Sequence, residues 1–179
     1  TVTITNKTVQ KAEQKMIAMF EKGVGQNYDI ASALIKSIRG SDPNAAVYYL
    51  ARLIEGGEDP KFIARRLIIS ASEDIGMANP NALLLANTGF NAVANVGYPE
   101  CRIILSQITV YLATSPKSNA SYLAIGKAQA HIKETGDLSV PLSLRNAPTK
   151  LMRELDYGKG YKYSHDFPNN FADQEFMPA

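Results

Sequence analysis

The sequence holds few residue patterns that could support catalysis. A site that hydrolyses a nucleotide needs a glycine-rich loop ending in Gly-Lys-Ser/Thr, whose backbone N–H groups hold the phosphates and whose hydroxyl binds magnesium. The nearest match, Gly158-Lys159-Gly160, lacks both the upstream glycine and the hydroxyl. We therefore expect no nucleotide hydrolysis by this chain alone.

The two histidines also give no sign of a reactive or metal-binding site. They are far apart in sequence, and no group of Cys, His or carboxylate residues has the spacing of metal ligands. His131 is expected late in a helix, where the helix dipole favours a positive charge. His165 lies between Ser164 and Asp166, but a catalytic triad depends on geometry, which neighbours on one loop do not supply. The pattern favours a chain without catalytic, metal or cofactor residues.

Two adjacent carboxylates, Glu73 and Asp74, fall near the end of an expected helix, where the helix dipole disfavours negative charge. A compensating cation is therefore expected. We predict an ion pair with an arginine from a neighbouring helix, and the candidates are Arg52, Arg65 and Arg66. Two alternatives stay open: a functional acid pair, and a phosphate-contacting role for the two adjacent arginines.

Basic residues outnumber acidic ones in the second half of the chain, although the net charge of the whole is only +2. Two segments there, 115–119 and 144–150, combine a turn with an expected helix start. They are typical of capped helices in a bundle, where Asn146 is a possible cap. Alternatively, their cations form a surface for DNA phosphates. The candidate contacts are Lys117, Arg145, Lys150 and Arg153.

The composition indicates a folded protein. A chain of 179 residues with 45% hydrophobic content can bury a core, and it fits one domain or a tightly packed pair. The single cysteine, Cys101, cannot form an internal disulfide, and no apolar run has the length of a signal peptide or membrane span. We expect a cytoplasmic protein with no membrane contact.

Helix-start signals recur along the chain. Asp42-Pro43, Asp59-Pro60 and Asn79-Pro80 each place a capping side chain before a proline, which loses no hydrogen bond at the first helical position. Apolar residues between them keep a helical period. The pattern predicts an all-α bundle of stacked helical hairpins. The expected helices cover residues 7–22, 29–39, 43–55, 60–75, 80–95, 99–113, 118–134 and 147–156.

The two ends of the chain differ from this scheme. Residues 1–27 combine one Lys-rich helix with a glycine-containing connector. Residues 158–179 contain glycines, prolines and five aromatic residues, so they cannot form a regular helix. Because aromatic rows are unfavourable in water, we expect this irregular tail to pack on its own domain or on a neighbouring subunit.

Ordered sequence blocks point to a family. They include Lys36-Ser37-Ile38-Arg39-Gly40-Ser41-Asp42-Pro43, Tyr48-Tyr49-Leu50-Ala51-Arg52, Ala71-Ser72-Glu73-Asp74-Ile75-Gly76, Pro116-Lys117-Ser118-Asn119 and Leu144-Arg145-Asn146-Ala147-Pro148-Thr149-Lys150-Leu151-Met152. From about residue 28 to the end, the chain resembles the C-terminal region of the bacterial replication-associated recombination protein A family. This family is also called maintenance of genome stability protein A, and its eukaryotic relative is the Werner-helicase-interacting protein.

The resemblance implies a division of the chain and a role. Residues 1–27 would be the end of an AAA+ lid helix and a hinge, 28–157 a helical domain like the clamp-loader collar, and 158–179 a truncated packing tail. Such a domain joins ATPase subunits into a homotetramer. The resemblance also implies partners for the full-length protein, namely DNA and single-stranded-DNA-binding protein. ATP and magnesium would bind an AAA+ module outside this chain.

Two functions follow for the chain itself. The first is an oligomerisation domain of a clamp-loader-like, DNA-dependent ATPase in replication-fork maintenance and recombination or repair. The alternative is a DNA-binding module that uses a basic face within residues 102–162.

Overall fold

The computed structural model describes residues 27–178, and the chain divides into two compact units between Ile125 and Gly126. The N-terminal unit here means residues 27–125, and the C-terminal unit means residues 126–178. The division falls within helix α6 (Ala120–Thr135), and the domain boundary expected after residue 157 stays a prediction. Helix α6 buries none of its residues, so it does not belong to the core of the preceding helices. The helix predicted at 7–22 lies outside the described residues.

The N-terminal unit is built from antiparallel helices, as the hairpin pattern predicts. Its helices are a helix whose described part covers 27–39, α2 (Pro43–Glu55), α3 (Pro60–Ser70), a π-helical turn (Ala71–Ile75), α4 (Asn81–Val96) and α5 (Cys101–Thr114). Across residues 27–178 the regular structure is helical, with no strand. The all-α prediction is therefore confirmed.

The first two Asp-Pro signals begin helices as predicted. The Asp42 carboxylate accepts a hydrogen bond of 2.9 Å from the backbone N–H of Ala45, and Pro43 opens α2. The Asp59 carboxylate accepts one of 3.0 Å from the N–H of Lys61 at the start of α3. Each bond satisfies one of the free donors of a helix N-terminus.

The third signal works differently. The Asn79 side chain caps no N–H group of α4; its amide donates to the Tyr111 hydroxyl at 2.9 Å and to the Ser115 hydroxyl at 3.2 Å. The capping role expected for Asn79 is therefore wrong, because its side chain faces the end of α5. The cap expected at Asn146 is also displaced: Thr149 caps the short helix α7 (Lys150–Glu154) instead.

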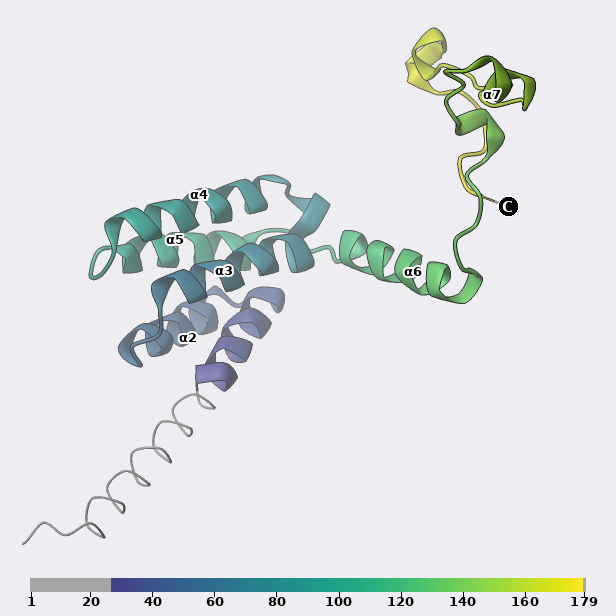
Figure 1. Cartoon of the computed structure of the whole chain (residues 1–179). Coiled ribbons are helices and arrows are strands. Elements are labelled where there is room, and N and C mark those ends of the chain that lie inside the picture. The colour runs from purple at the N-terminus through teal and green to yellow at the C-terminus, as the bar shows by residue number, and fades with distance from the viewer. Residues whose placement is uncertain (1–26, 179) are drawn as a thin grey trace, which may run out of the picture. The chain divides into compact units, whose positions relative to one another are not determined.

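The hydrophobic core lies between the helices of the N-terminal unit. Helix α3 packs against both α4 and α5, and α5 also packs against α2 (Figure 1). Its largest fully buried side chains are Leu34, Ile38, Leu50, Leu53, Ile63, Leu67, Ile75, Val93, Leu105, Ile108 and Leu112. At Gly89 the backbone of α4 comes so close to α5 that an added Cβ would lie 2.1 Å from Cδ1 of Ile108.

The C-terminal unit contains little regular structure. After α6 it has only α7 and three 3-10 turns, at Leu142–Leu144, Ser164–Asp166 and Pro168–Asn170. The tail after residue 157 is irregular, as predicted. Hydrogen bonds between Lys162 and Gln174 tie two of its segments together: Gln174 accepts from the Lys162 N–H at 3.1 Å and donates to its carbonyl at 2.7 Å.

Candidate assembly surface

A π-helical turn at the end of α3 positions the two carboxylates singled out in the sequence. Residues Ala71–Ile75 continue α3 with wider turns, and the element ends at Gly76, whose φ of 49° is easily adopted only without a side chain. The turn directs Asp74 into the unit, where it is 5% exposed. A buried carboxylate needs partners, because its desolvation is costly.

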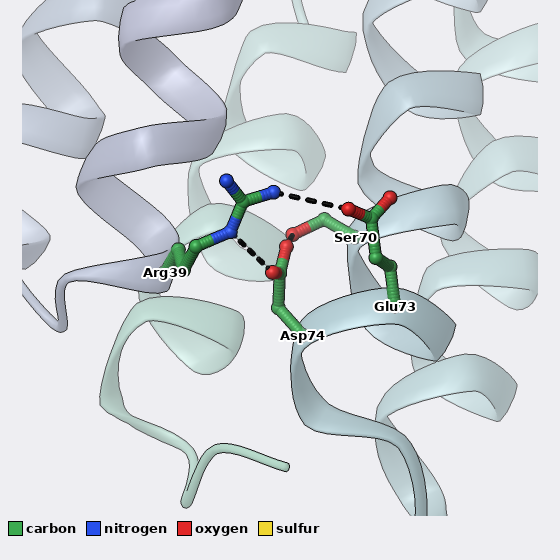
Figure 2. A network of polar contacts seen from close by, with 4 residues as sticks. All are labelled: Arg39, Ser70, Glu73 and Asp74. Carbon is green, nitrogen blue, oxygen red and sulfur yellow. Dashed lines mark hydrogen bonds and ion pairs between the residues drawn. The ribbon is translucent and has the colours of Figure 1, made fainter. Parts of the chain in front are cut away.

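Arg39 supplies the compensating charge. Its Nε donates to an Asp74 carboxylate oxygen at 2.5 Å, and its Nη2 donates to Glu73 at 3.1 Å (Figure 2). The Ser70 hydroxyl donates to the second Asp74 oxygen at 2.9 Å. The bond to Asp74 raises the pKa of Arg39 above its ordinary value. The network fastens the helix over 27–39 to the end of α3.

The expected ion pair is thus present, but its partner differs from the three predicted arginines. Arg65 lies 3.9 Å from Asp59, and within residues 27–178 neither Arg52 nor Arg66 takes part in an ion pair. In an antiparallel stack, alternate helices run in the same direction. The C-terminal ends of the helix over 27–39 and of α3 therefore meet, whereas Arg52 lies in the last turn of α2, at the opposite side.

The same turn holds the segment that leads into α6. The backbone carbonyl of Asp74 accepts a hydrogen bond of 2.8 Å from the N–H of Ser118. Lys117 donates through Nζ to the carbonyl of Ala113 at 3.0 Å and to that of Ser115 at 2.6 Å. Partial burial lowers the pKa of Lys117. Lys117 therefore caps the end of α5, and its ammonium is already occupied by backbone carbonyls.

Helix α6, which follows, exposes every one of its residues. Tyr122, Ile125 and Ile132 are 56%, 59% and 54% exposed. Their spacing of three and seven residues places them on one face of the helix. A helix ordinarily buries an apolar stripe of this kind, so the stripe is a candidate surface for packing against another molecule.

Apolar exposure continues through the C-terminal unit. Its only buried residue within the described range is Ala172, which is 6% exposed. Its exposed large apolar side chains are Ile132, Leu138, Val140, Leu142, Leu151, Leu155, Tyr161, Tyr163, Phe167, Phe171, Phe176 and Met177. This unit buries less surface than an independent domain ordinarily does. Its exposed aromatic and other large apolar side chains are of the types enriched at interfaces.

The four cations predicted to contact DNA fall in both units, and their role stays a prediction. Lys117 belongs to the N-terminal unit, and the other three belong to the C-terminal unit. Arg145 makes internal contacts: its Nε donates to the Val140 carbonyl at 2.7 Å, and its guanidinium lies 5.1 Å from the centre of the Tyr157 ring. Lys150 is solvated and lies 3.8 Å from Glu154.

Most of the chain matches a known protein family. Residues 40–179, most of the chain, match the family described as MgsA AAA+ ATPase C terminal. The chain belongs to this family. The resemblance predicted from the sequence blocks is confirmed. Among residues 27–178, no helix is both long and apolar enough to cross a membrane.

Curated relatives of the family carry related names. The chain is 48% identical to replication-associated recombination protein A of Coxiella burnetii over 92% of its own length and 37% of that protein. It is 47% identical to the Escherichia coli K12 protein of the same name, covering 87% of the chain and 35% of the relative. It is 40% identical to ATPase WRNIP1 of Dictyostelium discoideum, covering 93% and 19%. The chain thus spans little more than a third of these two bacterial relatives.

Sequence reasoning missed Arg39, although a signal for it exists. Arg39 is the last residue before Gly40, where its helix is predicted to end. Glu73 and Asp74 lie in the turn at the end of α3, which is the second helix after it in the chain. Helix ends that meet in a hairpin stack can be paired from sequence. This pairing of helix ends selects Arg39 as the partner of the carboxylates, and not Arg52, Arg65 or Arg66.

Proposed function

We propose that this chain is the assembly domain of an AAA+ ATPase that acts on DNA in replication-associated recombination. In this proposal the domain joins the ATPase subunits into a homotetramer. Membership in the family supports the ATPase context, and the relatives' names support the recombination context. The observation that carries the assembly role is the exposed apolar surface of α6 and the C-terminal unit.

The amount of exposed surface is sufficient for an interface with a second copy of the chain. Aromatic side chains bury about 150–250 Å² each, and the exposed apolar residues of α6 and the C-terminal unit are roughly half accessible. They therefore present on the order of 1,000 Å² of apolar surface, compared with about 800 Å² that one partner contributes to a standard interface. Burial of this area between copies would stabilise both units at once.

The test is the mass of the chain in solution, measured by analytical ultracentrifugation at tens of micromolar. We expect a tetramer. Ile125→Glu places a charge in the apolar stripe and should reduce the mass, whereas Ala130→Glu places the same charge on the opposite face of α6 and should leave it unchanged. A strictly monomeric native chain would contradict the proposal.

The DNA-binding alternative has less support, because Lys117 and Arg145 are engaged in contacts within their own units. In the proposed arrangement, DNA contact belongs mainly to the full-length protein, as do ATP, magnesium and single-stranded-DNA-binding protein, and the assembly acts in the cytoplasm. Salt-dependent DNA binding by this chain, lost in Lys150→Glu and Arg153→Glu, would favour the alternative.

A further inference from the structure

A long stretch of the N-terminal unit carries no charge. From Ile75 to Pro99 the sequence has no Asp, Glu, Lys, Arg or His. Charged residues make up 20% of the whole chain, so a stretch of this length would ordinarily hold about five. The stretch includes all of α4, which is the one α-helix in the described part of the chain without a charged side chain.

The uncharged helix is not buried on all sides. One face, formed by Ala82, Ala86, Gly89 and Val93, packs into the unit. The opposite face is open to solvent. Its exposed residues are Leu84, Asn87, Thr88, Asn91 and Asn95, which we name the α4 stripe. Their spacing of three and four residues aligns them along the helix, and Leu84 is 66% exposed.

A solvated helix face normally carries charged side chains, which keep it soluble. Depletion of charge is instead the compositional mark of a protein interface. The asparagine amides of the α4 stripe favour contact with an identical face, because each amide has both a donor and an acceptor. One asparagine row can therefore satisfy another identical row, whereas it offers no charge to attract an acidic or basic partner.

We propose that the α4 stripe is a second self-interface, in which two copies of α4 pack antiparallel about a two-fold axis. Figure 1 shows α4 at the outer side of the stacked helices, where a second copy can approach it. A second copy of α4 matches this face, because both faces are uncharged and both carry amide donors and acceptors. Near the centre of the stripe, Thr88 and Asn91 would lie beside the axis.

This inference rests on the proposed assembly function and adds its geometry. A two-fold contact uses the same patch on both subunits and alone yields only a dimer. Two different two-fold contacts, one through α6 and the C-terminal unit and one through α4, close an assembly of four subunits when their axes intersect at right angles. The tetramer would then be a pair of dimers.

The experiment compares two isosteric substitutions in the whole chain. Asn91→Asp adds a charge at the centre of the α4 stripe, and Asn44→Asp adds the same charge at an exposed position on α2. Like charges facing each other across the axis should raise the dissociation constant of the α4 contact about tenfold. Ultracentrifugation of Asn91→Asp should detect dimers where native protein and Asn44→Asp are tetramers. Circular dichroism checks that each variant keeps its helices.

A second background separates this inference from the proposed function. Ile125→Glu should leave dimers held by α4 alone, and adding Asn91→Asp should dissociate them to monomers. If Asn91→Asp matches Asn44→Asp in both backgrounds while Ile125→Glu still lowers the mass, the α4 interface is overturned and assembly through α6 stands. If Asn91→Asp lowers the mass and Ile125→Glu does not, α4 is an interface and the α6 surface is not.

Discussion

The two units of this chain are both helical, but they differ in what they bury. The N-terminal unit encloses a continuous core from five helical segments, with side chains such as Leu34, Leu67 and Leu105 fully buried. The C-terminal unit has Ala172 as its one buried residue in the described range, and its large apolar side chains are exposed. The first unit thus has a core that can stabilise it by itself, whereas the proposed assembly would supply the surface that covers the second.

This difference separates two uses of apolar residues. In the N-terminal unit, burial of each large side chain contributes about 1.5–3 kcal/mol to folding of the single chain. In α6 and the C-terminal unit, the same residue types remain largely exposed. In the proposed assembly these residues contribute only when another surface covers them, which would couple stability to assembly.

The largest expected effect comes from separating the units. A fragment of residues 1–125 should retain a cooperative thermal transition, because the core lies within it. A fragment of residues 126–179 should show no such transition at low micromolar concentration. Circular dichroism melts of the two fragments make the measurement. A cooperative, concentration-independent transition in the second fragment would contradict the comparison.

A matched pair of arginine substitutions tests the same contrast at single residues. Arg39→Met removes the partner of the buried Asp74 carboxylate, and we expect a loss of about 3 kcal/mol in the free energy of unfolding. Arg145→Met removes bonds to an exposed carbonyl and an aromatic ring, and we expect a loss of about 1 kcal/mol or less. Urea denaturation measures both. Equal losses would mean that the C-terminal unit is as tightly organised as the first.

The helices of the N-terminal unit could be predicted because local signals determine them. Asp42 and Asp59 cap helices, and prolines follow them at the positions where proline is tolerated. Where a capping residue also has a distant partner, the local signal is misleading. Asn79 bonds to Tyr111, which is 32 residues away, and no capping rule includes that contact.

The candidate site was less predictable than the fold. The adjacent carboxylates Glu73 and Asp74 indicated a missing cation, but its identity depended on which helix ends meet in space. The π-helical turn that aims Asp74 at Arg39 has no sequence signature of its own. The division of the chain within α6 has no sequence signal, because α6 is continuous in sequence and buries none of its residues.

Glycine-to-alanine substitutions, one in each unit, have the smallest expected effects on the free energy of unfolding, and the two effects have opposite signs. In α4, Gly89→Ala gains about 1 kcal/mol of helix propensity, but its Cβ meets Cδ1 of the buried Ile108 at 2.1 Å. Overpacking costs about 1–3 kcal/mol, so we expect a net loss of about 1 kcal/mol. In α6, an added Cβ at Gly126 meets nothing within 4 Å, and Gly126→Ala should gain up to about 1 kcal/mol.

Urea denaturation of both variants gives the signs, and Ile108→Val provides the control for the cause. This substitution removes Cδ1, so combining it with Gly89→Ala should cost less than the two single losses added together. Additive losses would show that Ile108 does not limit the approach of α4 to α5. A loss on Gly126→Ala would show that α6 is packed tightly at that position, and the contrast between a filled core and an open helix would then fail at α6.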